Sequence, residues 1–159
     1  MAKETRNRNI DETLRPSGAL LAVQTALSKA IERDAVDPSG YDATTLDLLV
    51  RLKLAPDNQL RAVELCQQLL LSPSHISRRI DRAQHAGLVA RHLDPNDRRA
   101  RLVALSAAGS QVIDRFMPQL ESVLQQIIFD TLTDPEIETL VELLNRIELA
   151  ARSTRGQTS

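Results

Sequence analysis

The sequence predicts a mainly α-helical protein that carries one small β-hairpin. Apolar residues recur at steps of three and four over most of the chain, which is the spacing of one helix face. One stretch, 93–106, instead combines a turn with a run suited to a short strand. With 159 residues, 42% hydrophobic and 26% charged, the chain has the composition of one globular domain, or of one domain plus a dimerisation extension.

Two helices are expected before residue 56. In the first, over about 17–31, the residues at helical spacing are Leu20, Val23, Leu27 and Ile31. Pro38, Ser39 and Gly40 mark a loop, after which Asp42 can cap the second helix. The apolar face of that second helix is formed by Leu46, Leu49, Val50 and Leu52, and residues 56–58 close it.

The next two helices are separated by a break at residues 71–73. The first of them is short, from about Arg61 to Leu70. Ser72 as N-cap and Pro73 at the first helical position begin the second, which runs to the C-cap glycine Gly87. Its apolar side consists of Ile76, Ile80 and Ala83, and the opposite side consists of Ser74, Arg78 and His85, with His75 and Arg82 flanking them. A small, polar and cationic face of this kind suits the DNA major groove, although an ordinary solvated helix face has the same appearance.

The stretch LDPNDRRARLVALS, residues 93–106, predicts the hairpin. A turn over 94–97 is followed by a strand over about 101–105, so the ribbon has two strands. Arg98, Arg99 and Arg101 give it a charged tip.

Two helices are expected after the hairpin. Ser106 caps a long one that is apolar on two sides and that Pro118 should kink. Because a helix apolar on two sides needs two partners, we expect it to pack on its own domain and on a second copy of the chain. The last helix begins with a capping box of Thr133 and Glu136 and a hydrophobic staple of Leu132 and Ile137.

Charge is unevenly distributed along the chain, although the net charge is only −1. Residues 72–101 contain seven arginines, three aspartates and all three histidines, whereas residues 102–151 contain two arginines and eight acidic residues. A basic segment of this kind is the electrostatic signature of phosphate binding.

Residues 60–109, LRAVELCQQLLLSPSHISRRIDRAQHAGLVARHLDPNDRRARLVALSAAG, resemble the winged helix-turn-helix core of the MarR family of bacterial transcriptional regulators. The most specific part is the wing signature, matched by Asp97, Arg99, Leu105, Ser106 and Gly109. SPSHISRRIDR resembles the recognition helix of the family, and AGLVAR its lead into the wing. The resemblance implies a winged helix-turn-helix plus a helical dimerisation region. Its expected parts are an N-terminal tail and dimerisation helix (1–40), the DNA-binding domain (41–105), and C-terminal dimerisation helices with a disordered tail (106–159).

The resemblance also implies roles for individual residues. Arg99 would contact the minor groove, Asp97 would orient it, and Arg98 would be a second contact. The candidates for base edges are Ser74, His75, Ser77 and Arg78, and the candidates for phosphates are Arg79, Arg82 and Arg101. We expect Asp81 to pair with Arg78, Arg82 or His85, because an unpaired carboxylate would repel phosphate.

Several classes of site are not expected. Cys66 is the single cysteine, so an internal disulfide is excluded, and no Cys/His spacing resembles a zinc site. Neither metal nor cofactor is therefore predicted, and Cys66 is interpreted as a small buried thiol. Tyr41, Phe116 and Phe129 are the only aromatic residues, so an effector pocket walled by aromatic rings is not predicted.

No apolar run reaches the length of a membrane span, and residues 2–9 carry no signal-peptide core, which indicates a cytoplasmic protein. The two ends, 1–9 and about 154–159, are too polar to be expected to pack.

Together with the resemblance, these patterns predict a homodimeric, sequence-specific DNA-binding regulator that acts as a repressor, and the resemblance implies its release by a small-molecule effector. Two copies would bind a pseudo-palindromic operator in double-stranded DNA with half-sites roughly 10 bp apart. A winged-helix module that binds protein instead of DNA is the alternative, against which the arginine-rich hairpin argues. An enzyme is disfavoured, because no Gly-rich phosphate loop, Ser/His/Asp order or buried carboxylate pair stands out.

Overall fold

The computed structural model of the chain describes residues 10–95 and 97–155, without the side chains of residues 13, 98, 99, 154 and 155. The N-terminal tail, Asn96 of the hairpin turn and the last four residues lie outside the described residues. The chain divides into two compact units, residues 1–120 and 121–159. The boundaries expected at residues 40 and 105 stay a prediction.

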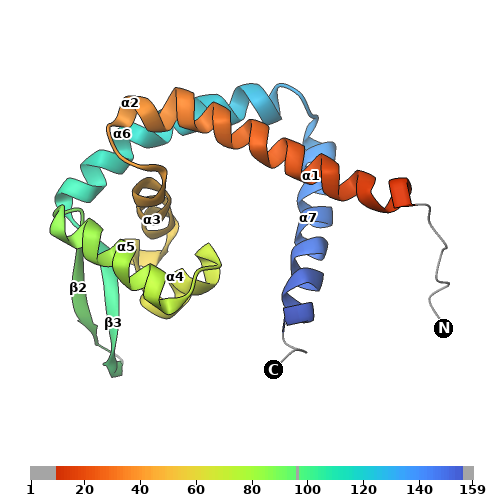
Figure 1. The fold of residues 1–159 in the computed structure, drawn as a ribbon. Coiled ribbons are helices and arrows are strands. Elements are labelled where there is room, and N and C mark those ends of the chain that lie inside the picture. The colour runs from red at the N-terminus through yellow and green to blue at the C-terminus, as the bar shows by residue number, and fades with distance from the viewer. Residues whose placement is uncertain (1–9, 96, 156–159) are drawn as a thin grey trace. The chain divides into compact units, whose positions relative to one another are not determined.

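The described part of the first unit contains helices and a small sheet (Figure 1). In chain order its elements are α1 (Ile10–Ile31), η1 (Glu32–Val36), α2 (Asp37–Ser39), α3 (Ala43–Leu54), η2 (Pro56–Asn58), β1 (Gln59–Arg61), α4 (Ala62–Leu69), α5 (Pro73–His85), β2 (Val89–Asp94), β3 (Asp97–Leu105) and most of α6 (Ala107–Leu124). Helix α1 begins seven residues before the expected start at residue 17, with Pro16 inside it. The Ser17 hydroxyl donates to the carbonyl of Leu14 at 2.8 Å in the turn that contains this proline.

Helix α3 begins where the sequence predicts. The Asp42 carboxylate accepts the N–H of Thr45 at 3.0 Å, which satisfies one of the free donors of the first turn. The helix ends at Leu54, and η2 reverses the chain with Asp57 and Asn58 at positive φ.

The sheet has three antiparallel strands in the order β1–β3–β2, so the prediction of a two-stranded ribbon was incomplete. Leu60 of β1 pairs with Val103 of β3, and Ala90 of β2 pairs with Ala104 of β3. Residue Arg61, expected at the start of a helix, is the last residue of β1, and α4 begins one residue later. A strand of three residues is too short to show the alternation that reveals longer strands, and only its pairing with β3 defines it.

Helix α5 begins and ends at the predicted signals. The Ser72 hydroxyl accepts the N–H of His75 at 3.4 Å, and Pro73 occupies the first turn. At the other end Gly87 has φ +72°, its N–H donates to the carbonyl of Gln84, and the N–H of Leu88 donates to the carbonyl of Ala83 at 2.9 Å. These two bonds form a Schellman motif, for which a residue without Cβ is favoured at the left-handed position.

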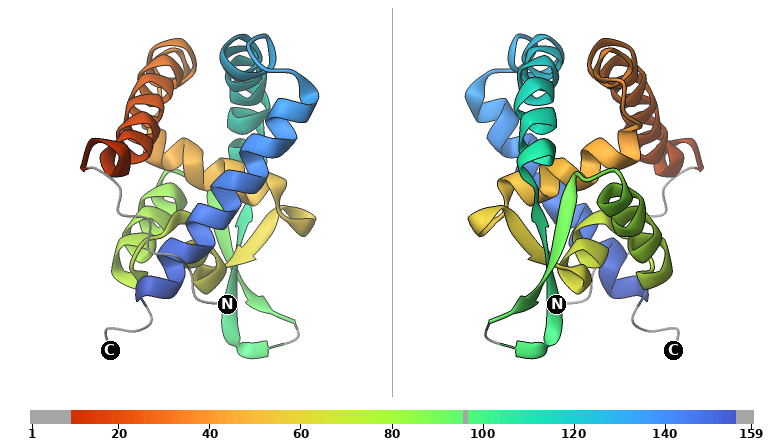
Figure 2. Two further views of the ribbon diagram at one scale, coloured as in Figure 1. Left: turned by 90° about the vertical axis from the view of Figure 1, so that its right-hand side faces the viewer. Right: turned by 90° about the vertical axis from the view of Figure 1, so that its left-hand side faces the viewer.

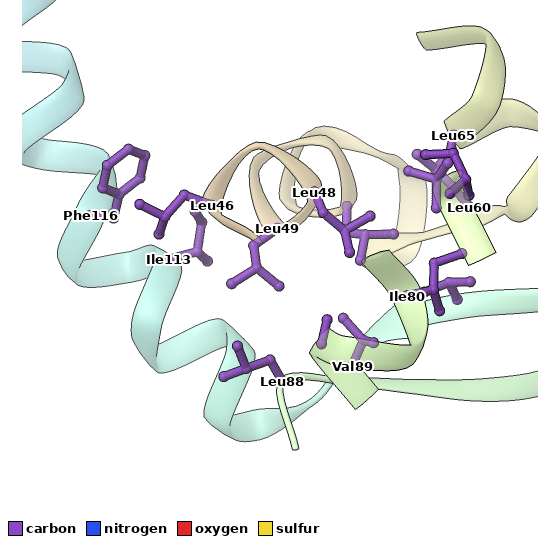
Figure 3. Packing of buried hydrophobic residues seen from close by; sticks show 14 of the residues in the cluster. Leu46, Leu48, Leu49, Leu60, Leu65, Ile80, Leu88, Val89, Ile113 and Phe116 are labelled. Carbon is purple, nitrogen blue, oxygen red and sulfur yellow. The ribbon is translucent and has the colours of Figure 1, made fainter. Parts of the chain in front are cut away.

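The hydrophobic core of the first unit is built around α3 (Figure 3). Leu46, Leu48, Leu49 and Leu52 are at most 1% exposed. They pack with buried residues from the sheet, α5 and α6: Leu60, Ile76, Ile80, Ala83, Val89, Val103, Ile113 and Phe116. The core therefore fixes the apolar side of α5 and leaves its other side to solvent.

Helix α6 begins beside the end of α5. The Ser106 hydroxyl accepts the N–H of Gly109 at 3.0 Å, as the predicted cap requires, and donates to the carbonyl of Gly87 at 2.6 Å. Gly109 is buried against Leu88: a Cβ at this position would lie 2.0 Å from the carbonyl oxygen of Leu88. Pro118 lies inside the continuous helix, and the kink expected there stays a prediction.

The second unit contains the end of α6, the π-helical turn η3 (Gln125–Phe129) and α7 (Asp134–Arg155). The N–H of Thr133 donates to the Glu136 carboxylate at 2.8 Å, which is one half of the predicted capping box. Leu132 and Ile137, the predicted staple, are both half-buried. The backbone N–H and the hydroxyl of Thr133 both donate to the Glu136 carboxylate. They favour its ionised form and so lower the pKa of Glu136.

Candidate nucleic-acid interface

The exposed side of α5 carries the residues that the sequence assigned to base recognition. Ser74, His75, Ser77 and Arg78 are all exposed, whereas Ile76 on the opposite side is 1% exposed. The Ser74 and Ser72 hydroxyls lie 3.0 Å apart at the helix start. The helix therefore presents short polar side chains and a guanidinium on a backbone that is fixed from behind by the core.

Of the cations expected to contact phosphates, Arg82 and Arg101 are exposed and Arg79 is not. The Arg79 side chain is 20% exposed, and its Nη1 atom lies 3.8 Å from an oxygen of Asp47 on α3. Asp47 also lies 3.5 Å from the Nε atom of Arg51. Arg79 is therefore directed in part toward α3 rather than wholly into solvent.

The predicted partner of Asp81 was wrong. Its carboxylate pairs with Arg91 on β2, at 2.6 Å from Nη2, and not with Arg78, Arg82 or His85. The same guanidinium donates through Nη1 to the amide oxygen of Gln84 at 3.0 Å. Because Arg91 comes from the neighbouring strand, the sequence spacing along α5 could not reveal this contact. The pair ties α5 to the base of the hairpin and leaves Arg78 and Arg82 at the surface.

The hairpin of β2 and β3 projects beyond α3, α4 and α5 in each view of the ribbon (Figures 1 and 2). Arg101 lies on β3 opposite Leu93 and is exposed. Arg98 and Arg99 also belong to β3, but their side chains lie outside the described residues, so the orientation of Arg99 by Asp97 stays a prediction. Asp97 itself is half-buried.

An ion pair that the sequence did not indicate joins the end of β1 to the turn end of this hairpin, where Asp94 is the last residue of β2. Two guanidinium atoms of Arg61, Nε and Nη2, lie 2.8 and 2.5 Å from Oδ2 of Asp94. Asp94 is 4% exposed, and the pair raises the pKa of Arg61, first through the hydrogen bond and then through the charge of Asp94. The residues are 33 positions apart in the sequence, where Asp94 reads only as a turn residue and Arg61 only as a helix residue.

A hollow of about 220 Å³ lies apart from these cations, between α2 with the segment that follows it and one side of α6. It is lined by Pro38, Ser39, Tyr41, Val112, Arg115, Phe116 and Gln119. Two of the three aromatic residues of the chain therefore contribute to its wall.

Within residues 10–95 and 97–155, no group of three or more His, Cys, Asp or Glu side chains is placed to bind a metal ion. No helix in the described part of the chain has both the length and the apolar character needed to cross a membrane. Cys66, expected to be buried, is half-buried and packs against the core.

Comparison with known proteins agrees with this geometry. A family model described as MarR family matches residues 39–100. The crystal structure of Sco3205, a MarR family transcriptional regulator from Streptomyces coelicolor in complex with DNA, is similar to 90% of this chain, with a TM-score of 0.72 and 27% identity over 89% of that protein. Over these matched residues the chain is similar to the MarR family, and the structural likeness extends over most of its length.

Curated relatives of this chain are also described as regulators. It is 26% identical over 132 residues to the multiple antibiotic resistance protein MarR of Salmonella typhimurium, which covers 83% of the chain and 90% of that protein. It is 34% identical over 86 residues to the uncharacterised HTH-type transcriptional regulator YcgE of Bacillus subtilis, and this match spans about half, 54%, of each of the two proteins. The matches confirm the winged-helix fold and the expectation of a transcriptional regulator rather than an enzyme.

Proposed function

We propose that the chain is a homodimeric, sequence-specific DNA-binding repressor that acts in the cytoplasm and is released from DNA by a small-molecule effector. The observation that carries the proposal is the exposed polar and cationic side of α5, backed by a buried apolar side and flanked by an arginine-bearing hairpin. Sco3205, which shares this fold, is known in complex with DNA, and this supports the same class of partner here.

In the proposed complex α5 enters the major groove. The short side chains Ser74 and Ser77 let the helix approach the bases, and Arg78 can bond guanine O6 and N7 with two N–H groups. His75 lies in the first turn of the helix, from which recognition helices reach base edges. Arg82 and Arg101 then bind phosphates, and Arg79 does so when its guanidinium leaves the long contact with Asp47.

The hairpin is proposed to act as the wing. Arg99, with Arg98 as a second contact and Asp97 as the group that orients it, would enter the minor groove, where negative potential is concentrated. The hairpin projects past α5 in both views, as the proposed engagement of neighbouring grooves by the two elements requires (Figure 2).

Dimerisation is supported by large apolar side chains that the single chain leaves in solvent. On α1 these are Ile10, Leu14, Leu20, Leu21 and Val23, and on α7 they are Leu140, Val141, Leu143, Leu144, Ile147 and Leu149. Each is at least 38% exposed. An amphipathic helix of a stable protein normally buries its apolar side against a partner. A second copy of the chain is the proposed partner, because a symmetric dimer presents two α5 helices to a pseudo-palindromic site.

The hollow beside α6 is the proposed effector site. A small molecule bound there would touch both α6 and the segment before α3, and α3 is the helix on which α5 packs. An effector that fits one arrangement of these helices better than another would shift the spacing of the two α5 helices and weaken DNA binding.

A mobility-shift titration with DNA from upstream of the protein's own coding sequence tests the proposal. We expect a specific complex below micromolar concentration at moderate salt. The Arg78→Ala variant should lose about 1–3 kcal/mol of binding free energy and should also discriminate less between DNA sequences. Absence of a shift in that range, or binding that hardly depends on salt, would contradict DNA recognition and favour the protein-binding alternative. Light scattering of the same sample tests the dimer.

A further inference from the structure

An ion pair between Arg61 and Asp94, called the clamp, joins the start of α4 to the turn end of the wing, where Asp94 is the last residue of β2. Arg61 donates from Nε and Nη2 to one oxygen of Asp94, at 2.8 and 2.5 Å. Asp94 is the one charged residue among those described that the fold buries. Since a buried carboxylate costs free energy unless it is paired and hydrogen-bonded, this position is an unfavourable one for an ordinary turn residue.

The clamp starts at Arg61, where the sheet loses a strand, and reaches Asp94, which lies nearer the turn. Strand β1 ends at Arg61, which pairs with Leu102 of the central strand β3. Beyond this point the hairpin continues toward its tip with β2 and β3 alone, and the register shifts between Leu93 and Asp94. Because β3 lies between β1 and β2, the Arg61–Asp94 contact spans all three strands and joins the end of β1 to the free part of the ribbon, at the position where β2 ends.

A ribbon of two strands is only marginally stable by itself, so a contact from outside the ribbon can set its direction. Arg61 is suited to this role because its own backbone is fixed: its N–H donates to the Glu64 carboxylate of α4 at 2.6 Å. The guanidinium is thus attached to the helix-turn-helix, and it bonds a residue three positions before the first residue of β3.

We propose that Arg61 and Asp94 are positioning residues of the DNA-binding site, which hold the wing at the angle that brings Arg99 into the minor groove. The inference rests on the proposed DNA-binding function and adds to it two residues that need not touch DNA. Their contribution to affinity passes through the wing.

The direction in which one substitution changes the operator affinity distinguishes this positioning role from direct phosphate binding by Arg61. Asp94→Asn removes a negative charge close to the proposed DNA surface, so if Arg61 acted only as a phosphate ligand the operator affinity would rise or stay unchanged. The positioning role predicts the opposite, a loss of about tenfold, which lies within the range that a lost groove contact costs. Asp114→Asn is the matched control, because it breaks the 2.7 Å pair of Asp114 with Lys53 on α3 and should leave the affinity unchanged.

A double-mutant cycle with Arg99 shows whether the effect passes through the wing. In an Arg99→Ala background, Asp94→Asn should change the operator affinity by no more than about twofold, because the contact that it positions is already gone. Hydroxyl-radical footprinting of the Asp94→Asn complex should show lost protection in the minor groove beside each half-site, with protection at the major-groove sites of α5 retained. A general loss of folding would weaken both kinds of protection together.

Arg61→Lys provides a second variant in case Asp94→Asn does not fold. It keeps the positive charge but not the two-atom contact. Its complex should therefore also lose the minor-groove protection beside each half-site, called the wing footprint. Additive effects of Asp94→Asn and Arg99→Ala, or a full wing footprint in Arg61→Lys, would overturn the positioning role. Failure of the wild-type protein to shift operator DNA would instead overturn the proposed function itself, so the two failures are distinguishable.

Discussion

At the scale of single residues, Asp42 determines where α3 begins. Its carboxylate accepts the backbone N–H of Thr45 at 3.0 Å and the Thr45 hydroxyl at 2.7 Å, and it also accepts the hydroxyl of Thr44. These bonds lower the pKa of Asp42 from 3.8 to about 2, the Thr44 hydroxyl contributing most and partial burial opposing it. Since α3 is the centre of the core, this cap supports the element on which the recognition helix packs.

The stability that the protein loses when the Asp42 cap is removed should therefore depend on pH. The folded pKa lies below the unfolded one, so the stabilisation is complete above about pH 4 and is lost as the pH falls toward 2. We expect Asp42→Ala to lower the free energy of unfolding by about 1 kcal/mol at pH 7, and by less at pH 3. Urea unfolding at the two pH values measures this. Asp42→Asn, which can cap but cannot titrate, is the control, and an alanine deficit that is equal at pH 7 and pH 3 would rule out the ionised cap as its cause.

At the scale of elements, the sequence predicted best those parts whose signals are local. The cap at Ser72, the glycine at the end of α5 and the alternation of apolar and polar sides on that helix all follow from neighbouring residues, and all are present in the structure. The missed features depend on distant partners. Strand β1 exists because it pairs with β3, and Asp94 is buried because Arg61 reaches it across the sheet. No pattern within either segment carries that information.

The packing of α6 on the end of α5 depends on a glycine whose role the wing signature alone does not explain. A Cβ on Gly109 would lie 2.0 Å from the Leu88 carbonyl oxygen and 3.2 Å from Cδ2 of Leu105. The Leu88 carbonyl cannot move away freely, because it accepts the N–H of Ser106 at 3.0 Å. The close approach of the two elements therefore requires glycine here.

Gly109→Ala should destabilise the fold by about 1–3 kcal/mol, because the clash exceeds the gain of about 1 kcal/mol in helix propensity. Gly18→Ala in α1 is the matched control. Nothing lies within 4 Å of a Cβ built on Gly18, so the same substitution should stabilise by about 0.5–1 kcal/mol. Chemical denaturation of both variants tests the contrast, and an equal gain in stability for both would show that α6 does not pack as closely as described.

At the scale of the whole molecule, the charge distribution separates the basic segment that is proposed to bind DNA from the rest of the chain. The excess of arginine over aspartate in residues 72–101 and the excess of acidic residues in 102–151 almost cancel in the net charge of −1. Internal pairs reduce the first excess: Arg91 is neutralised by Asp81, and Arg79 is partly neutralised by Asp47. The count of arginines in the sequence is therefore larger than the number of arginines free to bind phosphate. The sequence does not reveal these pairs, because the pairing partners lie on other elements.

The salt dependence of operator binding should report both the phosphate contacts and the number of copies bound. Each neutralised phosphate contributes about 0.9 to the slope of log affinity against log salt concentration. Arg82→Ala removes one such contact per copy, so a dimer on its operator should lose about 2 from the slope, whereas a bound monomer would lose only about 1.

Arg146→Ala on α7 removes the same charge at a position where the side chain is 71% exposed and pairs with Glu142 at 3.9 Å. It lies in the acidic part of the chain, so it should leave the slope unchanged, because the positive charge that it removes faces solvent and not phosphate. Filter-binding titrations between about 50 and 200 mM salt span the range over which phosphate contacts change affinity most clearly. Equal shifts for Arg82→Ala and Arg146→Ala would mean that binding responds to the net charge of the molecule, and the assignment of phosphate contacts to α5 would then be wrong.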